Sequence, residues 1–194
     1  MSNERNELNA CKLGLTIAVS GLPGSGKTTL ARLLAQRLGL RYLSLGMIFR
    51  DIARERGLSL EELSIIAERD PSIDYMIDER AKEEGSKGCI VIDGHISAWI
   101  LKGIAHLRIV VIAPLKVRVE RIARRDGKSF EDALREVSIR EESERRRYKR
   151  LYNIDVNDLS DVDLVINTGK FNIEETLSIA LEAVKRVLKK ISLR

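Results

Sequence analysis

A glycine-rich segment near the N-terminus has the residue types and spacing needed to hold a chain of phosphates. Residues 21–28 read Gly-Leu-Pro-Gly-Ser-Gly-Lys-Thr, which matches the Gly-x-x-x-x-Gly-Lys-Thr pattern of a phosphate-binding loop, or P-loop. Glycines let backbone N–H groups turn toward the phosphates, Lys27 places a charge between the β- and γ-phosphates, and Thr28 offers a hydroxyl to Mg²⁺. A turn that needs glycine only for its backbone conformation is the alternative. The predicted phosphate-binding residues are Gly21, Leu22, Pro23, Gly24, Ser25, Gly26, Lys27, Thr28 and Thr29.

The residues on either side of this loop favour a strand and a helix. The apolar run 15–19 predicts a buried strand, and residues 28–38 have a helical periodicity that ends at Gly39. Further short β-prone runs, separated by helical stretches, occur at residues 42–43, 90–92, 107–112 and 164–166. This alternation predicts an α/β fold of three layers, in which helices cover both faces of a five-stranded parallel sheet.

Two helical segments interrupt the regular alternation. Residues 46–85 are helical throughout, with a predicted helix start at Ser59, three residues before Glu62, and we interpret them as an insertion between the second and third strands. A second helical segment covers residues 129–152 and is capped by Ser129.

Polar residues follow two of the predicted strands. The segment from Ser44 to Arg50 follows the second strand, and Asp93-Gly94-His95 ends the third. Because α/β proteins bind ligands at the carboxyl edge of the sheet, we expect a second substrate to lie between these segments. Arginine suits a phosphate there because its planar guanidinium matches phosphate oxygens in two directions.

A basic stretch carries the remaining candidates. Arg140, Glu144 and Arg147 are four and three residues apart, so they share one face of the second helical segment. No apolar residue occurs from 140 to 147, so we expect this stretch to have little to bury and to be held weakly without a ligand. A salt-bridged surface helix is the alternative. Together with Arg121 and Arg125, the stretch predicts a lid, covering about residues 121–150, that brings arginines to a phosphate.

The order of these motifs resembles the nucleoside monophosphate kinases, most closely the archaeal cytidylate kinases, from Leu15 to nearly the end of the chain. The resemblance implies ATP-dependent phosphorylation of CMP and dCMP, with ATP and Mg²⁺ as cofactors, in pyrimidine nucleotide metabolism. It assigns the monophosphate to Ser44, Gly46, Arg50, Asp78, Asp93, Gly94, His95 and Glu144. It assigns catalysis to Lys27, Arg121, Arg125, Arg140 and Arg147, and the metal to Thr28 and Asp93.

Some of these assignments are more detailed. The resemblance implies that Asp78 accepts a hydrogen bond from the exocyclic amine of cytosine, and that Arg80 occupies a basic position of the same insertion. His95 departs from the family, which usually has arginine there. A neutral imidazole carries no charge and makes no two-pronged contact, so a strict preference for cytosine is less secure.

Composition bounds the remaining properties. The 194 residues carry 34 Lys and Arg against 29 Asp and Glu, a net charge of +5 that suits an anionic partner. We expect a flexible tail at residues 1–12 and one domain over residues 13–194. No apolar run is long enough for a membrane, and the N-terminus is not built like a signal peptide, so we expect a cytoplasmic protein. We also expect it to be a monomer. Cys11 and Cys89 fit no metal-ligand spacing, and we interpret them as reduced.

Two alternative functions stay open. One is another small-substrate P-loop kinase, such as an adenylate or dephospho-coenzyme A kinase, because the fold and the loop are shared and few residues choose the substrate. The other is an RNA-associated nucleotide switch that uses the basic stretch. The three Phe, four Tyr and one Trp offer few stacking platforms for single strands, so we expect no nucleic-acid partner.

Overall fold

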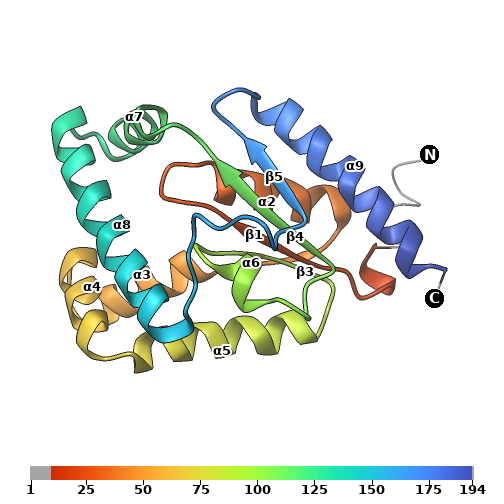
Figure 1. The fold of residues 1–194 in the computed structure, drawn as a ribbon, viewed down its shortest axis with the longest axis horizontal. Coiled ribbons are helices and arrows are strands. Elements are labelled where there is room, and N and C mark those ends of the chain that lie inside the picture. The colour runs from red at the N-terminus through yellow and green to blue at the C-terminus, as the bar shows by residue number, and fades with distance from the viewer. Residues whose placement is uncertain (1–9, 194) are drawn as a thin grey trace.

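Five parallel strands form the centre of the computed structural model, which describes residues 10–193 (Figure 1). They pair in the order β2-β3-β1-β4-β5. Their bounds are β1 Thr16–Ser20, β2 Arg41–Ser44, β3 Ile90–Asp93, β4 Leu107–Ile112 and β5 Leu164–Asn167. The predicted five-stranded parallel sheet is therefore confirmed. Since β1 pairs with β3 on one side and β4 on the other, the chain reverses its direction of travel across the sheet at the P-loop strand, which is where open α/β sheets bind ligands.

Helices cover both faces of the sheet, as predicted. The helices are α2 Lys27–Leu38, α3 Leu45–Glu55, α4 Leu60–Arg69, α5 Ser72–Ser86, α6 Ser97–Ile100, α7 Leu115–Asp126, α8 Phe130–Tyr152 and α9 Ile173–Ile191. One hydrophobic core joins α2 and α9 to the sheet, and a second joins the sheet to α3, α4 and α5. Figure 1 shows α9 and α5 on opposite sides of the strands.

The helical segment between β2 and β3 contains three helices, α3 to α5. Ser59 caps α4, because its hydroxyl accepts from the N–H of Glu62 while the Glu62 carboxylate accepts from the N–H of Ser59. Pro71 separates α4 from α5. The predicted capping pair is present because it depends only on neighbouring residues.

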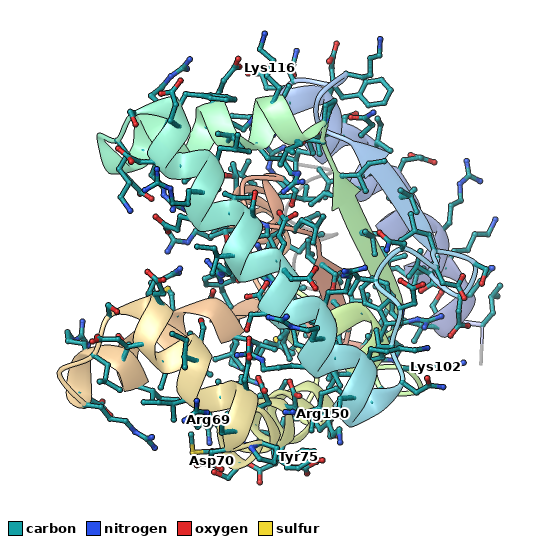
Figure 2. The ribbon with its side chains drawn as sticks, turned by 60° about the vertical axis from the view of Figure 1, so that its left-hand side comes forward. Arg69, Asp70, Tyr75, Lys102, Lys116 and Arg150 are labelled. Carbon is teal, nitrogen blue, oxygen red and sulfur yellow. A yellow bond between two sulfur atoms is a disulfide. The ribbon has the colours of Figure 1, made fainter. Side chains whose placement is uncertain are left out.

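Helix α8 extends from α7 to the far end of α4 (Figure 1). Its first half packs on α7, and near its end the Arg150 guanidinium donates to the backbone carbonyl of Glu68 in α4. Figure 2 shows Arg150 there, with Arg69 at the end of α4 and Tyr75 on α5 nearby. The prediction that residues 140–147 have little to bury was wrong, because Glu144 and Arg147 are buried in charged contacts with other elements. Charged side chains thus hold the stretch where apolar ones are missing.

The N-terminal segment is attached to the sheet. Residues 1–9 of the predicted tail lie outside the described residues, whereas residues 10–12 form a helical turn with Ala10 fully buried. Cys11 and Cys89 form a disulfide with a Cα–Cα distance of 4.4 Å, so the prediction of reduced thiols was wrong. The two cysteines are 78 residues apart and meet only because β1 and β3 pair. Among residues 10–193, no helix is long and apolar enough to cross a membrane.

Candidate active site

A cavity of about 1160 Å³ lies at the carboxyl ends of the strands. Most predicted site residues line it: Pro23, Gly24, Gly26, Lys27, Thr28, Thr29, Ser44, Gly46, Arg50, Asp78, Asp93, Gly94, His95, Arg121, Arg125, Arg140, Glu144 and Arg147. The exceptions are Gly21, Leu22 and Ser25, which lie behind the loop beside a smaller cavity of about 160 Å³. Residues predicted from separate motifs thus meet around one space.

Asp93, at the end of β3, is held by two hydroxyl groups. Its two carboxylate oxygens accept from the Thr28 hydroxyl and from the Tyr42 hydroxyl, each at 2.7 Å. Hydroxyl and carboxylate oxygens are the ligands that Mg²⁺ prefers, so Thr28 and Asp93 fit the predicted metal site. Tyr42 was not predicted, because its contact requires that β2 and β3 be neighbours, and the sequence does not show strand order.

Several cations face one another across the cavity. Burial and, to a smaller extent, the nearby charge of Arg140 lower the pKa of Lys27 to about 8. Burial also lowers the pKa of Arg50, with Arg140 and Arg125 adding to the effect. Cations placed this close repel one another unless an anion lies between them. The arrangement is therefore suited to a bound phosphate.

Glu144 of α8 lies between a lid arginine and His95. Its carboxylate accepts from Nε of Arg140 at 3.0 Å and contacts Nδ1 of His95. Burial lowers the pKa of His95 to about 4, so the imidazole is neutral near pH 7. Burial alone would raise the pKa of Glu144, but its contacts with His95 and Arg140 lower this pKa. Arg140 is the decisive partner, because its guanidinium stays charged whereas the His95 imidazole is neutral. His95 thus connects the end of β3 to the predicted lid.

Arg147 has protein partners already. Its side chain is 3% exposed, its Nε lies 3.3 Å from a carboxylate oxygen of Asp74, and its guanidinium donates to the Ser64 carbonyl. These contacts join α8 to α4 and α5. Loss of Arg147 would leave Asp74 buried without its partner, which is costly, so a substitution here tests both folding and catalysis.

Asp78 lies on the cavity wall formed by α5. It is 7% exposed and accepts a hydrogen bond from the Tyr152 hydroxyl. Burial raises its pKa to about 6. Arg80, which the resemblance placed nearby, is not among the residues that line the cavity and pairs with Glu84 at 3.2 Å. Of these two residues, only Asp78 faces the cavity.

The two arginines of α7 that were assigned to the predicted lid have different partners. Arg121 donates to the carbonyl of Gly24 and to both oxygens of Thr168, whereas Arg125 pairs with the neighbouring Asp126 at 2.6 Å. Thr168 was not predicted, nor were Phe171 and Ile173, which line the same cavity with 43% and 61% of their surface exposed. These three residues follow the last β-prone run, and that position could have identified them as cavity residues from the sequence.

Kinases are among the solved structures with a similar fold. Shikimate kinase from Bacteroides thetaiotaomicron superimposes with a TM-score of 0.59 at 14% identity, covering 88% of this chain and 98% of that one. A gluconokinase from Sinorhizobium meliloti 1021 gives a TM-score of 0.60 at 14% identity, covering 93% and 97%. At these identities the likeness shows the fold alone. Together, the sheet order and the phosphate-binding loop define a protein of the P-loop kinase fold.

Sequence comparison narrows this class. The chain belongs to the cytidylate kinase-like family, which matches residues 16–170. It is 53% identical over 175 residues to the cytidylate kinase of Staphylothermus marinus, covering 90% of this chain and 99% of that protein. It is 51% identical to the cytidylate kinase of Aeropyrum pernix, covering 87% and 98%. The resemblance inferred from the motifs is confirmed.

Proposed function

We propose that the protein transfers the γ-phosphoryl group of ATP to CMP and dCMP, giving ADP and the nucleoside diphosphate. The observation that carries this proposal is the meeting of the P-loop lysine with Arg50 and Arg140 around one cavity, which leaves room for a donor and an acceptor. The name of the two relatives described above, cytidylate kinase, supports CMP as the acceptor. With this substrate, a monomeric cytoplasmic enzyme of pyrimidine nucleotide metabolism is the simplest assignment.

The proposed reaction needs positioning and charge compensation more than proton transfer. An oxygen of the CMP phosphate attacks the γ-phosphorus, the bond to the β-phosphate oxygen breaks, and ADP leaves with the electron pair. Because the attacking oxygen is already ionised, no general base is needed. Arg50 holds the acceptor phosphate, while Lys27 and Arg140 neutralise charge on the moving group.

Mg²⁺ completes the charge balance in this proposal. Thr28 and Asp93 would hold it, and the metal would neutralise charge on the triphosphate. The Tyr42 hydroxyl keeps one Asp93 oxygen in place, which leaves the carboxylate oriented toward Thr28. Helix α8 covers the cavity and carries Arg140 and Glu144, so it excludes water that would otherwise hydrolyse ATP.

A panel of phosphate acceptors tests the proposal. The purified protein is given ATP, Mg²⁺ and one of CMP, dCMP, UMP or AMP, and ADP release is followed in a coupled assay. We expect turnover with CMP and dCMP well above that with AMP. ADP release with AMP but not with CMP would contradict the substrate assignment, and release without any acceptor would indicate a simple ATPase.

The proposed reading of cytosine by Asp78 predicts a pH dependence. The ionised carboxylate accepts from the cytosine amine and the protonated form accepts less well, so CMP should bind more tightly as pH rises through about 6. We expect the KM for CMP to fall several-fold between about pH 5 and pH 7 in the unsubstituted protein. In Asp78→Asn, the part of the pH dependence of KM that comes from Asp78 should be absent, because an amide does not titrate.

The control for that experiment is the variant itself. The phosphate of CMP also titrates near pH 6, and this contribution is the same for both proteins. The measured quantity is therefore the difference between the two pH profiles of KM. Parallel profiles would show that Asp78 does not read the base.

A further inference from the structure

Three successive carbonyl groups of the phosphate-binding loop are held from outside the loop. They belong to Pro23, Gly24 and Ser25. The donors come from α7 and from the turn after β5, which are far from the loop in the sequence. They are the Arg118 guanidinium at 3.1 Å, the Arg121 guanidinium at 3.2 Å and the Thr168 hydroxyl at 2.7 Å, respectively.

These contacts decide where the N–H groups of the loop point. In a planar trans peptide the carbonyl oxygen and the following N–H point in opposite directions. Arg118 borders the smaller cavity behind the loop, so a Pro23 carbonyl held there turns the N–H of Gly24 toward the large cavity. The Ser25 carbonyl, held by Thr168, likewise fixes the peptide plane that carries the N–H of Gly26. The N–H of Ser25 has another role, because it donates to the Leu22 carbonyl within the loop.

Arg118 is built into this position. Its side chain is 7% exposed, and its Nε also donates to the Ala113 carbonyl at 3.1 Å, so the guanidinium plane is fixed from two sides. The α7 backbone touches the loop as well, since a Cβ on Gly24 would lie 2.4 Å from the Arg118 carbonyl oxygen. Arg118 does not line the large cavity, and borders the smaller one behind the loop instead. It therefore acts on a ligand in the large cavity indirectly, through the residues that it holds.

Arg118 also contacts the predicted lid. Its guanidinium pairs with the carboxylate of Glu141, which lies on α8 next to Arg140. The same cation thus has one hydrogen bond to the phosphate-binding loop and an ion pair to the helix that covers the cavity. Removing one partner of a buried arginine destabilises a protein more than breaking an exposed ion pair does.

We propose that Arg118 is a positioning residue that aims the N–H of Gly24 at the bound phosphates from behind the loop and ties the loop to α8 through Glu141. Thr168 has the matching task for Gly26. This inference rests on the proposed use of a nucleoside triphosphate. It assigns a role to residues that the sequence motifs do not include.

Separate binding measurements for donor and acceptor test the inference. Arg118→Met keeps an unbranched apolar side chain in place of the arginine stem and removes the donors. Arg124→Met is the matched control, because Arg124 is an exposed arginine of the same helix. Titration calorimetry with ATP, with inorganic tripolyphosphate and with CMP gives three affinities for each protein. We expect Arg118→Met to bind ATP and tripolyphosphate about ten-fold more weakly, with CMP affinity within about two-fold of the unsubstituted protein. Arg124→Met should bind all three ligands normally.

A second pair of variants keeps the test decisive if Arg118→Met does not fold. Thr168→Val removes the hydroxyl at nearly constant shape and should weaken ATP and tripolyphosphate binding, whereas Thr168→Ser retains the hydroxyl and should restore it. Normal ATP and tripolyphosphate affinity in both Arg118→Met and Thr168→Val would overturn the inference, as would an equal loss for CMP. If the unsubstituted protein bound tripolyphosphate but not ATP, ATP would not be the phosphate donor. The tripolyphosphate affinities of the variants would in that case still test the role of Arg118.

Discussion

Lys27→Ala is expected to lower kcat/KM for phosphoryl transfer by at least about a hundred-fold, because it removes a preorganised charge beside the group being transferred. The stability of the fold should not fall. Lys27 faces Arg140 and Arg50 across the cavity, and burial and Arg140 already lower its pKa to about 8. Removing it relieves repulsion between like charges, so the midpoint of thermal unfolding should be unchanged or slightly higher.

The measurement pairs a coupled ADP-release assay with thermal unfolding of the same preparations. Lys116→Ala is the matched control, because Lys116 is exposed at the outer end of α7 (Figure 2) and does not line the cavity. Activity within about two-fold of the unsubstituted protein in Lys27→Ala would refute its phosphate role. A loss of activity together with a large drop in unfolding temperature would assign Lys27 to the fold instead.

Cys89→Ser is expected to destabilise the protein strongly without impairing the site. A disulfide that closes a loop over a sequence separation of 78 restricts the unfolded chain, and the chain-entropy relation gives about 4.5 kcal/mol for that length. For a chain of this size the unfolding temperature should fall by about 10 °C. Turnover at moderate temperature should persist, because Cys89 precedes β3 and the cavity lies at the other end of that strand.

Thiol titration and unfolding curves with and without reductant check this prediction. Reductant should lower the unfolding temperature of the unsubstituted protein to that of the variant, and should leave the variant unchanged. Two free thiols in the unfolded but unreduced protein would contradict the disulfide. Disulfides are unusual in cytosolic proteins other than those of hyperthermophiles. A high content of charged residues, here 32% of the chain, is also common in proteins from hot environments.

The disulfide also illustrates what sequence patterns miss. Cys11 and Cys89 each looked incidental, because nothing near either residue identifies the other. Residues 140–147 looked unable to bury anything, because apolar content was the criterion. The structure buries Arg147 by pairing it with Asp74 on another helix, so charge complementarity replaces apolar area there. In both cases the decisive partner is distant in the chain.

The sequence by itself determined the features that depend on neighbouring residues. The P-loop, the strand–loop–helix around it, the cap at Ser59 and the polar strand ends are local patterns, since backbone geometry and periodicity act over a few residues. They also predicted which residues line the cavity, because parallel strands bring their carboxyl ends to one edge. Residue types at a strand end or in a glycine loop thus carry chemical information without a structure.

Only the tertiary structure decided how those residues are held. The contact of Tyr42 with Asp93, that of Arg118 with the Pro23 carbonyl and that of His95 with Glu144 all depend on strand order and helix docking. Such contacts join segments that fold together to bury apolar surface, and their partners are chosen by geometry rather than by sequence spacing. The residues that perform the proposed chemistry were therefore predictable, whereas those that position them were not.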